Sequence, residues 1–177
     1  MKLSLSDNTI IQKDLSRYGF SQKGHRIRFI RAFRAAQESS IRFIRYYYRL
    51  KCKIFETIYG IEIPVETQIG EGFVLNHAFN ITINPSVIIG KNCTIHKGVL
   101  IGAENRGLRK GCPVIGNNVW IGANAVIVGN VHIGDDVLIA PNSYVNCDVP
   151  SHSIVLGSPC ITRHKDNATE GYILFTN

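Results

Sequence analysis

Aliphatic residues recur every six positions through the central and C-terminal parts of the chain. The clearest run has isoleucine at residues 115, 121, 127, 133 and 139. An earlier phase places isoleucine at 83, 89, 95 and 101, after Ile63, Ile69 and Leu75. This period is typical of a parallel β-helix, in which three hexapeptides make one triangular coil and the aliphatic residue points inward. A β-sandwich would show period-two alternation with loops of unequal length.

The first third of the chain has apolar residues three and four positions apart. Residues 29, 30 and 33 and residues 41, 44 and 48 fit helical stripes. We expect helices near 10–18, 25–37 and 39–58, the last ended by Gly60. We therefore divide the chain into a basic α-helical region (1–59), a β-helix (60–161) and a C-terminal tail (162–177). The expected fold is mainly β, with an N-terminal α-helical cap.

Two interruptions break the repeat. Eight residues rather than six separate Leu75 from Ile83, and fourteen separate Ile101 from Ile115. Because regular coils only build the scaffold, we expect function at the interruptions. The first contains His77, and Glu62 lies about one coil earlier. A histidine oriented by a carboxylate suits general-base chemistry, and a surface histidine without function is the alternative. No histidines have metal-ligand spacing, so no metal is expected.

Charge is concentrated at the N-terminus. Residues 1–53 hold 13 Lys and Arg against 3 Asp and Glu, whereas the remainder holds 7 against 10. Aromatic residues alternate with these cations, at Phe29, Phe33, Phe43 and 46–48. This arm is either a packed helical cap with a solvated basic face or a docking surface for an anionic membrane or polymer. A nucleic-acid partner is not expected, because no recognition motif accompanies the charge.

The cysteine pattern indicates reduced thiols. The five cysteines include no C-x-x-C pair, no signal peptide opens the chain, and no apolar run approaches the roughly 20 residues that cross a membrane. We expect a cytoplasmic protein, with peripheral attachment to the membrane if the basic arm docks there.

Several stretches resemble one family. They are Leu75-Asn-His-Ala, the run from Gly111 to Ala123, Gly129-Asn-Val-His-Ile-Gly, the run from Val149 to Pro159, and Lys13-Asp-Leu-Ser-Arg-Tyr in the arm. They are similar to the serine acetyltransferase branch of the hexapeptide-repeat acyltransferases, and most similar to its polysaccharide and sugar O-acetyltransferases. The resemblance implies a left-handed parallel β-helix of about five coils, an exception to the right-handed crossover rule. It also implies a homotrimer with active sites between subunits.

The resemblance also assigns site residues. His77 matches the catalytic histidine, and Glu62 replaces the aspartate that steadies it. The resemblance places the acceptor site at Asp14, Asn76, Arg109 and Cys112. Acetyl-CoA, the co-substrate, would lie along Gly102, Ala103, Ala123, Pro141 and Gly157, mostly on backbone groups, with Lys165 near a CoA phosphate. Backbone N–H groups around Gly102 and Ala103 would hold the developing oxyanion.

Four departures from the serine acetyltransferase pattern bear on the acceptor. Cys112 replaces a second histidine, Gly111 an arginine that would meet the serine carboxylate, Asn76 an aspartate, and Pro141 a residue with a free N–H. We therefore expect acetylation of a sugar hydroxyl in capsule, lipopolysaccharide or exopolysaccharide biosynthesis. The alternatives are serine O-acetylation in cysteine biosynthesis and a non-catalytic β-helix scaffold.

Cys112 invites a second hypothesis. It lies beside Arg109 and Lys110, whose charges would lower the pKa of its thiol and make it a nucleophile. An inert loop thiol or a substrate contact is the alternative.

Overall fold

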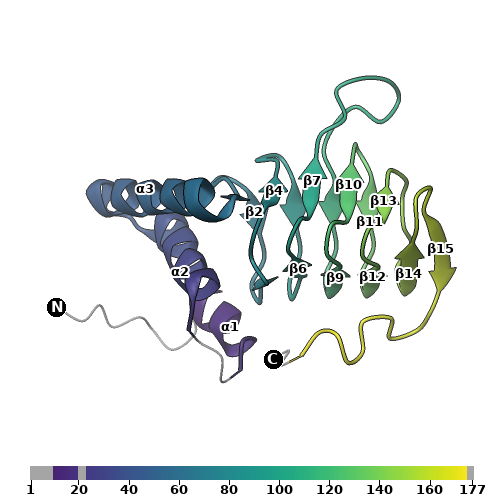
Figure 1. Cartoon of the computed structure of the whole chain (residues 1–177), viewed down its shortest axis with the longest axis horizontal. Coiled ribbons are helices and arrows are strands. Elements are labelled where there is room, and N and C mark those ends of the chain that lie inside the picture. Colours follow the sequence, from purple (N-terminus) through teal and green to yellow (C-terminus); the bar gives the residue numbers. More distant parts are fainter. Residues whose placement is uncertain (1–9, 20–22, 175–177) are drawn as a thin grey trace.

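The computed structural model describes residues 10–19 and 23–174, with three helices at one end of a long triangular β-prism (Figure 1). Residues 1–9, 20–22 and 175–177 lie outside this description, and with them the ends of the expected helical region and tail. No helix in the described ranges is long and apolar enough to cross a bilayer.

The helices are close to those expected. They are α1 (Ile10–Ser16), α2 (His25–Glu38) and α3 (Arg42–Tyr59). Gly60 ends α3 with a left-handed backbone (φ 63°), and its N–H bonds to the Glu56 carbonyl. Glycine adopts this conformation without the steric cost that a Cβ would bring, which explains why the helix stops there.

The strands form three faces of the prism. Face A consists of β1 (Ile61–Glu62), β4 (Ile81–Ile83), β7 (Leu100–Gly102), β10 (Val126–Val128) and β13 (Tyr144–Val145). Face B consists of β2 (Gln68–Ile69), β5 (Ile88–Ile89), β8 (Val114–Ile115) and β11 (His132–Ile133). Face C consists of β3 (Val74–Asn76), β6 (Thr94–His96), β9 (Val119–Ile121), β12 (Val137–Ile139) and β14 (Ser153–Leu156). All these pairs are parallel; β15 (Ile161–His164) then adds antiparallel to β14.

The six-residue pattern is confirmed by burial. Each aliphatic residue that marks the repeat points into the prism and stacks on its counterpart in the next coil, as Ile69, Ile89, Ile115 and Ile133 do on face B. The three faces make a left-handed parallel β-helix of about five coils, as expected. Its core is therefore a column of aliphatic side chains that runs the length of the prism.

The coils differ in length where the sequence predicted interruptions. Paired residues are 20 apart between the first two coils (Leu75 and Ile95) and 26 apart across the next pair (Ile95 and Ile121), against 18 in the regular coils. A third irregularity was missed: on face C the last step, from Val137 to Ser153, is two residues short of a regular coil.

The corners on either side of face C use left-handed backbone conformations. The corner between faces C and A, called corner CA, has positive φ at Asn80, Gly98, Asn124, Asn142 and Gly157, and the first coil adds a second such residue, His77. The corner between faces B and C, called corner BC, has it at Gly72, Asn92, Asn118, Asp136 and His152. Glycine and asparagine tolerate this region best, so one such residue per coil turns the chain sharply.

The C-terminal segment runs back along the prism toward the helices (Figure 1). Asp136 accepts hydrogen bonds from the N–H groups of Ala168 and Thr169 and from the Thr169 hydroxyl. Farther along, Arg17 of the N-terminal region donates to the carbonyl of Leu174. The tail thus connects the last coils to the helical region, which the sequence did not predict.

Candidate active site

His77 lies at corner CA in the first coil, directly after β3. Its side chain is exposed and its φ is 51°, in the left-handed region. The backbone hydrogen bonds of this corner match Gly98 to Asn80 (φ 52°), so Asn80 turns the corner in the first coil and His77 is an additional left-handed residue in the two-residue insertion. A histidine in this conformation is strained relative to glycine or asparagine, and such strain concentrates at functional positions. The backbone observation therefore adds to the chemical reason for choosing His77.

The turn that carries His77 is held by the helices. His25, at the start of α2, donates from Nε2 to the carbonyl of Ala78 at 2.8 Å and stacks on Tyr59 with ring centroids 4.4 Å apart. The N–H of Leu75 donates to the buried Tyr18 hydroxyl at 2.8 Å. Both contacts fix the backbone beside His77, so the helical region positions this turn.

A row of rings runs from His77 along face C. The His77 and His96 rings are 6.2 Å apart, His96 and Trp120 are 4.7 Å apart, and Trp120 and Tyr172 of the tail are 5.0 Å apart. Asn76 links to this row, since its Nδ2 lies 3.4 Å from Nε2 of His96 and its Oδ1 accepts from Arg26 at 3.4 Å. Burial lowers the pKa of His96, and the neighbouring His77 lowers it further.

Sequence reasoning missed this row. His96 follows the inward Ile95 and points outward, and outward on face C is toward His77 and Trp120. The available signal was coil register: Asn76 and His96 each follow an inward residue on the same face, 20 positions apart.

Glu62 occupies the first strand of face A. It is exposed, pairs in register with Thr82, and accepts from the Thr82 hydroxyl at 3.4 Å. His77 precedes the strand that carries Thr82. Within residues 10–19 and 23–174, no hydrogen bond or ion pair joins His77 to Glu62. His77 therefore precedes the strand that pairs with the strand of Glu62, but the two side chains of the expected dyad do not contact each other.

Three of the expected acetyl-CoA positions share corner CA with His77. The turns of this corner are joined along the prism: Gly98 N–H bonds Phe79 O, Asn124 N–H bonds Lys97 O, and Asn142 N–H bonds Ala123 O, all near 3 Å. Ala123, Pro141 and Gly157 lie in successive turns of this ladder. Small side chains here leave the backbone accessible, which suits a co-substrate bound through main-chain groups.

The other expected co-substrate positions lie elsewhere. Gly102 ends β7 and Ala103 follows it, at the edge of face A opposite His77. Lys165 lies beyond β15, where its N–H bonds the carbonyl of His152 at corner BC. One edge of face A thus carries His77 and three expected co-substrate positions, Ala123, Pro141 and Gly157. The opposite edge carries Gly102 and Ala103, and Glu62 lies on the face between them. Lys165 is separated from this group by face C.

The long insertion forms a hairpin-like loop that projects from the prism (Figure 1). Glu104 and Gly111 form a reciprocal pair of backbone hydrogen bonds at its base. The carbonyl of Arg109 accepts from Asn130 N–H, which holds the loop against the next coil. Arg109 and the tip residue Leu108 are exposed, and Leu108 is uncovered along its whole side chain.

The nucleophile hypothesis for Cys112 depended on a lowered thiol pKa, and this expectation was wrong. The pKa of the Cys112 thiol is raised by burial rather than lowered by Arg109 and Lys110. Its Sγ lies 3.4 Å from Oδ1 of Asn84. A thiol with a raised pKa is mostly protonated near neutral pH and is a poor nucleophile. The location of Cys112, at the base of the loop, still leaves an acceptor contact open.

Asp14 is in a different environment from the one expected. It is fully buried, pairs with Arg34 at 2.7 Å and accepts the N–H of Phe73 at 2.8 Å. Arg34 also donates to the carbonyls of Ile69 and Gly70. Asp14 therefore fastens the helices to the first coil, and a carboxylate with these partners is not free to meet an acceptor. Burial raises the pKa of the Asp14 carboxyl, and the positive charge of Arg34 offsets only part of this rise.

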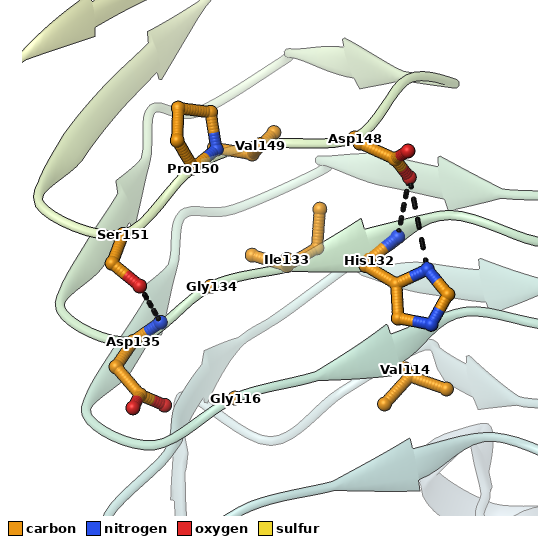
Figure 2. Close-up of a pocket in the computed structure, with 10 residues that line it drawn as sticks. All are labelled: Val114, Gly116, His132, Ile133, Gly134, Asp135, Asp148, Val149, Pro150 and Ser151. Carbon is orange, nitrogen blue, oxygen red and sulfur yellow. Dashed lines mark hydrogen bonds and ion pairs between the residues drawn. The ribbon is translucent and has the colours of Figure 1, made fainter.

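A hollow of about 600 Å³ lies away from these residues. Figure 2 shows that it lies on the last coils, between the His132–Asp148 pair and the Ser151–Asp135 contact. Face B has no strand in the fifth coil, only an isolated bridge from Ile133 to Val149. The hollow is thus the uncovered end of face B, where the last coil is short, and it contains none of the expected site residues.

Comparison with known families identifies the repeat. Residues 112–147 match the family model described as bacterial transferase hexapeptide (six repeats). This match covers the strands from β8 to β13 and the corners between them, which carry the most regular part of the six-residue repeat.

Its relatives fall into two groups. A protein of Escherichia coli K12 named as the colanic acid biosynthesis acetyltransferase WcaB is 43% identical over 105 residues, 59% of this chain and 64% of that protein. Serine acetyltransferase 2 of Arabidopsis thaliana is 37% identical over 110 residues, 62% of this chain and 34% of that protein. The chain thus spans between about a third and two thirds of these relatives.

Solved serine acetyltransferases share the fold of this chain. The Neisseria gonorrhoeae enzyme aligns with a TM-score of 0.71 at 26% identity, over 88% of this chain and 64% of that chain. The soybean apoenzyme aligns with a TM-score of 0.72 at 23% identity, over 87% and 67% of the two chains. These alignments extend over more of this chain than the sequence matches do.

Proposed function

We propose that this chain is an acetyl-CoA-dependent O-acetyltransferase whose acceptor is a sugar hydroxyl. The observation that carries the proposal is the exposed His77 in a strained turn that the helices hold in place, at the end of a ladder of small-residue turns. A general base beside accessible backbone groups suits acyl transfer from a thioester. The similarity to acetyltransferases supports the donor.

In the proposed reaction His77 removes the proton from the acceptor hydroxyl. The hydroxyl oxygen then attacks the thioester carbonyl carbon, a C–O bond forms and the C–S bond breaks. The CoA thiolate leaves and receives the proton from the His77 imidazolium. Glu62 stabilises that imidazolium through the field of its carboxylate, and backbone N–H groups at Gly102 and Ala103 hold the oxyanion. Ala123, Pro141 and Gly157 line the path of acetyl-CoA.

The loop geometry supports a sugar rather than L-serine. Gly111 has a φ of 138°, and a Cβ placed there would lie 3.0 Å from Cβ of Asn130. An arginine, which serine acetyltransferases carry at this position by the resemblance, would strain this backbone. Of the relatives, WcaB is named for colanic acid, a polysaccharide. Asn76, His96 and Trp120 offer polar and flat apolar surface of the kind that pyranose rings contact.

An acceptor panel tests this proposal. Release of the CoA thiol is followed with acetyl-CoA and either L-serine or a set of free, nucleotide-linked and lipid-linked sugars. We expect turnover with a sugar and at most slow turnover with L-serine. Efficient turnover with L-serine and none with sugars would instead support the serine O-acetyltransferase of cysteine biosynthesis. No thiol release with any acceptor, in protein that binds CoA, would support the non-catalytic scaffold.

We further propose that the protein acts in the cytoplasm, where acetyl-CoA is made, as a homotrimer. Its helical region provides peripheral association with an anionic membrane. Sugar acceptors for surface polysaccharides are commonly built on lipid carriers, so this association would raise the local acceptor concentration.

A further inference from the structure

Helix α3 is apolar on two faces. One face packs on α2 and the first coil through Tyr48, Cys52, Phe55 and Tyr59, which are buried or half-buried. The other face is uncovered: Phe43 is 80% exposed, Tyr46 68% and Leu50 53%, and the stripe continues through Tyr47, Ile54 and Ile58. A helix that is apolar beyond its packing face carries a second surface that requires a partner.

The structure therefore divides the aromatic residues of the basic arm. Phe29 and Phe33 are fully buried and stack on one another within the helical core, as the packed-cap interpretation expected. Phe43, Tyr46 and Tyr47 belong to the uncovered stripe. The packed-cap interpretation is thus confirmed for α2, whereas α3 presents an exposed apolar surface.

Cations border the stripe on both sides. At 3.6 residues per turn, Arg42, Arg49 and Lys53 follow one edge of the stripe and Lys51 the other. Beyond Lys51 a shallow groove of about 430 Å³ lies between α2 and α3, with Arg28 and Arg31 at its rim and Ile54 and Phe55 in its floor. In the described part of the chain, Arg28, Arg31 and Arg42 have no carboxylate within 4.0 Å.

We propose that this surface binds the anionic surface of a phospholipid membrane, with the α3 stripe at the acyl boundary and phosphate groups against Arg28, Arg31, Arg42 and Lys51. Apolar stripes with cationic edges are the signature of helices that lie in a bilayer interface. The phenol rings of Tyr46 and Tyr47 suit the same depth, being apolar with a polar tip.

A second copy of the chain is the less favourable occupant. The residues that border the stripe are cations, and the two nearest carboxylates, Glu56 and Glu66, already pair with Lys53 and Arg49. Copies that met along this stripe would bring rows of like charge together, which opposes association. An anionic bilayer instead neutralises both rows.

Vesicle co-sedimentation of the full chain tests the proposal without reference to activity. We expect binding to phosphatidylcholine vesicles containing phosphatidylglycerol, weakening as salt rises, and little binding to phosphatidylcholine alone. The triple variant Arg28→Gln, Arg31→Gln, Lys51→Gln should bind about a hundredfold more weakly. A matched control, Arg106→Gln, Lys110→Gln, Arg163→Gln, removes three exposed cations from the β-helix and should retain binding. Equal weakening by both triples would overturn the proposed location.

A second pair of changes tests the apolar stripe. Phe43→Ser with Leu50→Ser alters exposed side chains, so circular dichroism should be unchanged while vesicle binding falls at least tenfold. Protein that stays in the supernatant with anionic vesicles at low salt would refute the proposal. So would a double variant that loses self-association in light scattering but not vesicle binding, since the stripe would then contact a second copy.

Discussion

His77 combines an exposed imidazole with a backbone conformation that few residues adopt. Replacing it with alanine would change both features, because alanine is also strained at positive φ. Asparagine tolerates this region and occupies the equivalent corner at Asn124 and Asn142. His77→Asn is therefore the sharper variant, since it removes the base while keeping a residue suited to the turn.

We expect His77→Asn to lower kcat by about 10² to 10⁴ while leaving the affinity for CoA and the melting temperature nearly unchanged. Steady-state kinetics with the best acceptor, together with CoA titration calorimetry, measure both. Wild-type turnover in the purified variant would remove His77 from the mechanism.

Glu62 gives a graded test of the dyad. Because it accepts a hydrogen bond from Thr82 and does not contact His77, we expect Glu62→Gln to lower kcat by about tenfold, less than His77→Asn. Matching losses from the two changes would mean that Glu62 moves into contact with His77 when substrates bind. Glu66→Gln, also exposed on the first coil, is the control for loss of charge and should have little effect.

At the scale of elements, the tail depends on one carboxylate. Burial alone would raise the pKa of Asp136, but hydrogen bonds from Thr169, His152 and Ala168 outweigh it and hold the pKa below its ordinary value of 3.8. A carboxylate with a depressed folded pKa stabilises the structure above its unfolded pKa, and the contribution disappears as pH falls through the folded value. The tail should therefore stay docked at neutral pH and loosen only in strong acid.

The sole tryptophan reports on this contact, because Trp120 packs edge-on against Tyr172 of the tail. We expect Asp136→Asn to loosen the tail by about 1–2 kcal/mol, seen as a red-shifted Trp120 emission and faster amide exchange in residues 165–174. Asp166→Asn, an exposed change in the same segment, is the control. Unchanged emission and exchange in Asp136→Asn would show that other contacts hold the tail.

At the scale of the whole molecule, Leu108 at the tip of the projecting loop is fully exposed and packs against no apolar residue in the part of the chain that the structure describes. In the expected homotrimer the loop would reach a neighbouring subunit and cover Leu108, and cyclic closure would leave no open filament. We expect light scattering to give three times the 19.7 kDa of the chain. Leu108→Asp should shift the population toward monomer, whereas Arg106→Ser, in the same loop, should not. A monomeric wild-type protein would contradict shared active sites.

Much of the scaffold followed from the sequence alone. The hexapeptide spacing identified the inward residues of the first four coils, because each repeat makes the same local choice of strand, turn and buried side chain. The helices and their end at Gly60 were equally local. His77 was also identified from the sequence, since a break in a regular pattern stands out without knowledge of contacts.

Tertiary structure decided what lies beside His77. Coil lengths of 20 and 26 residues bring His96 and Trp120 into its row, and no short-range pattern encodes that register. Burial converted Asp14 from an expected acceptor contact into the partner of Arg34, because a charge removed from water must be paired. Packing on one side of α3 likewise determined which of its aromatic residues stay exposed. Sequence thus determined the repeat and the place of its interruptions, whereas long-range contacts decided which polar and aromatic groups surround His77.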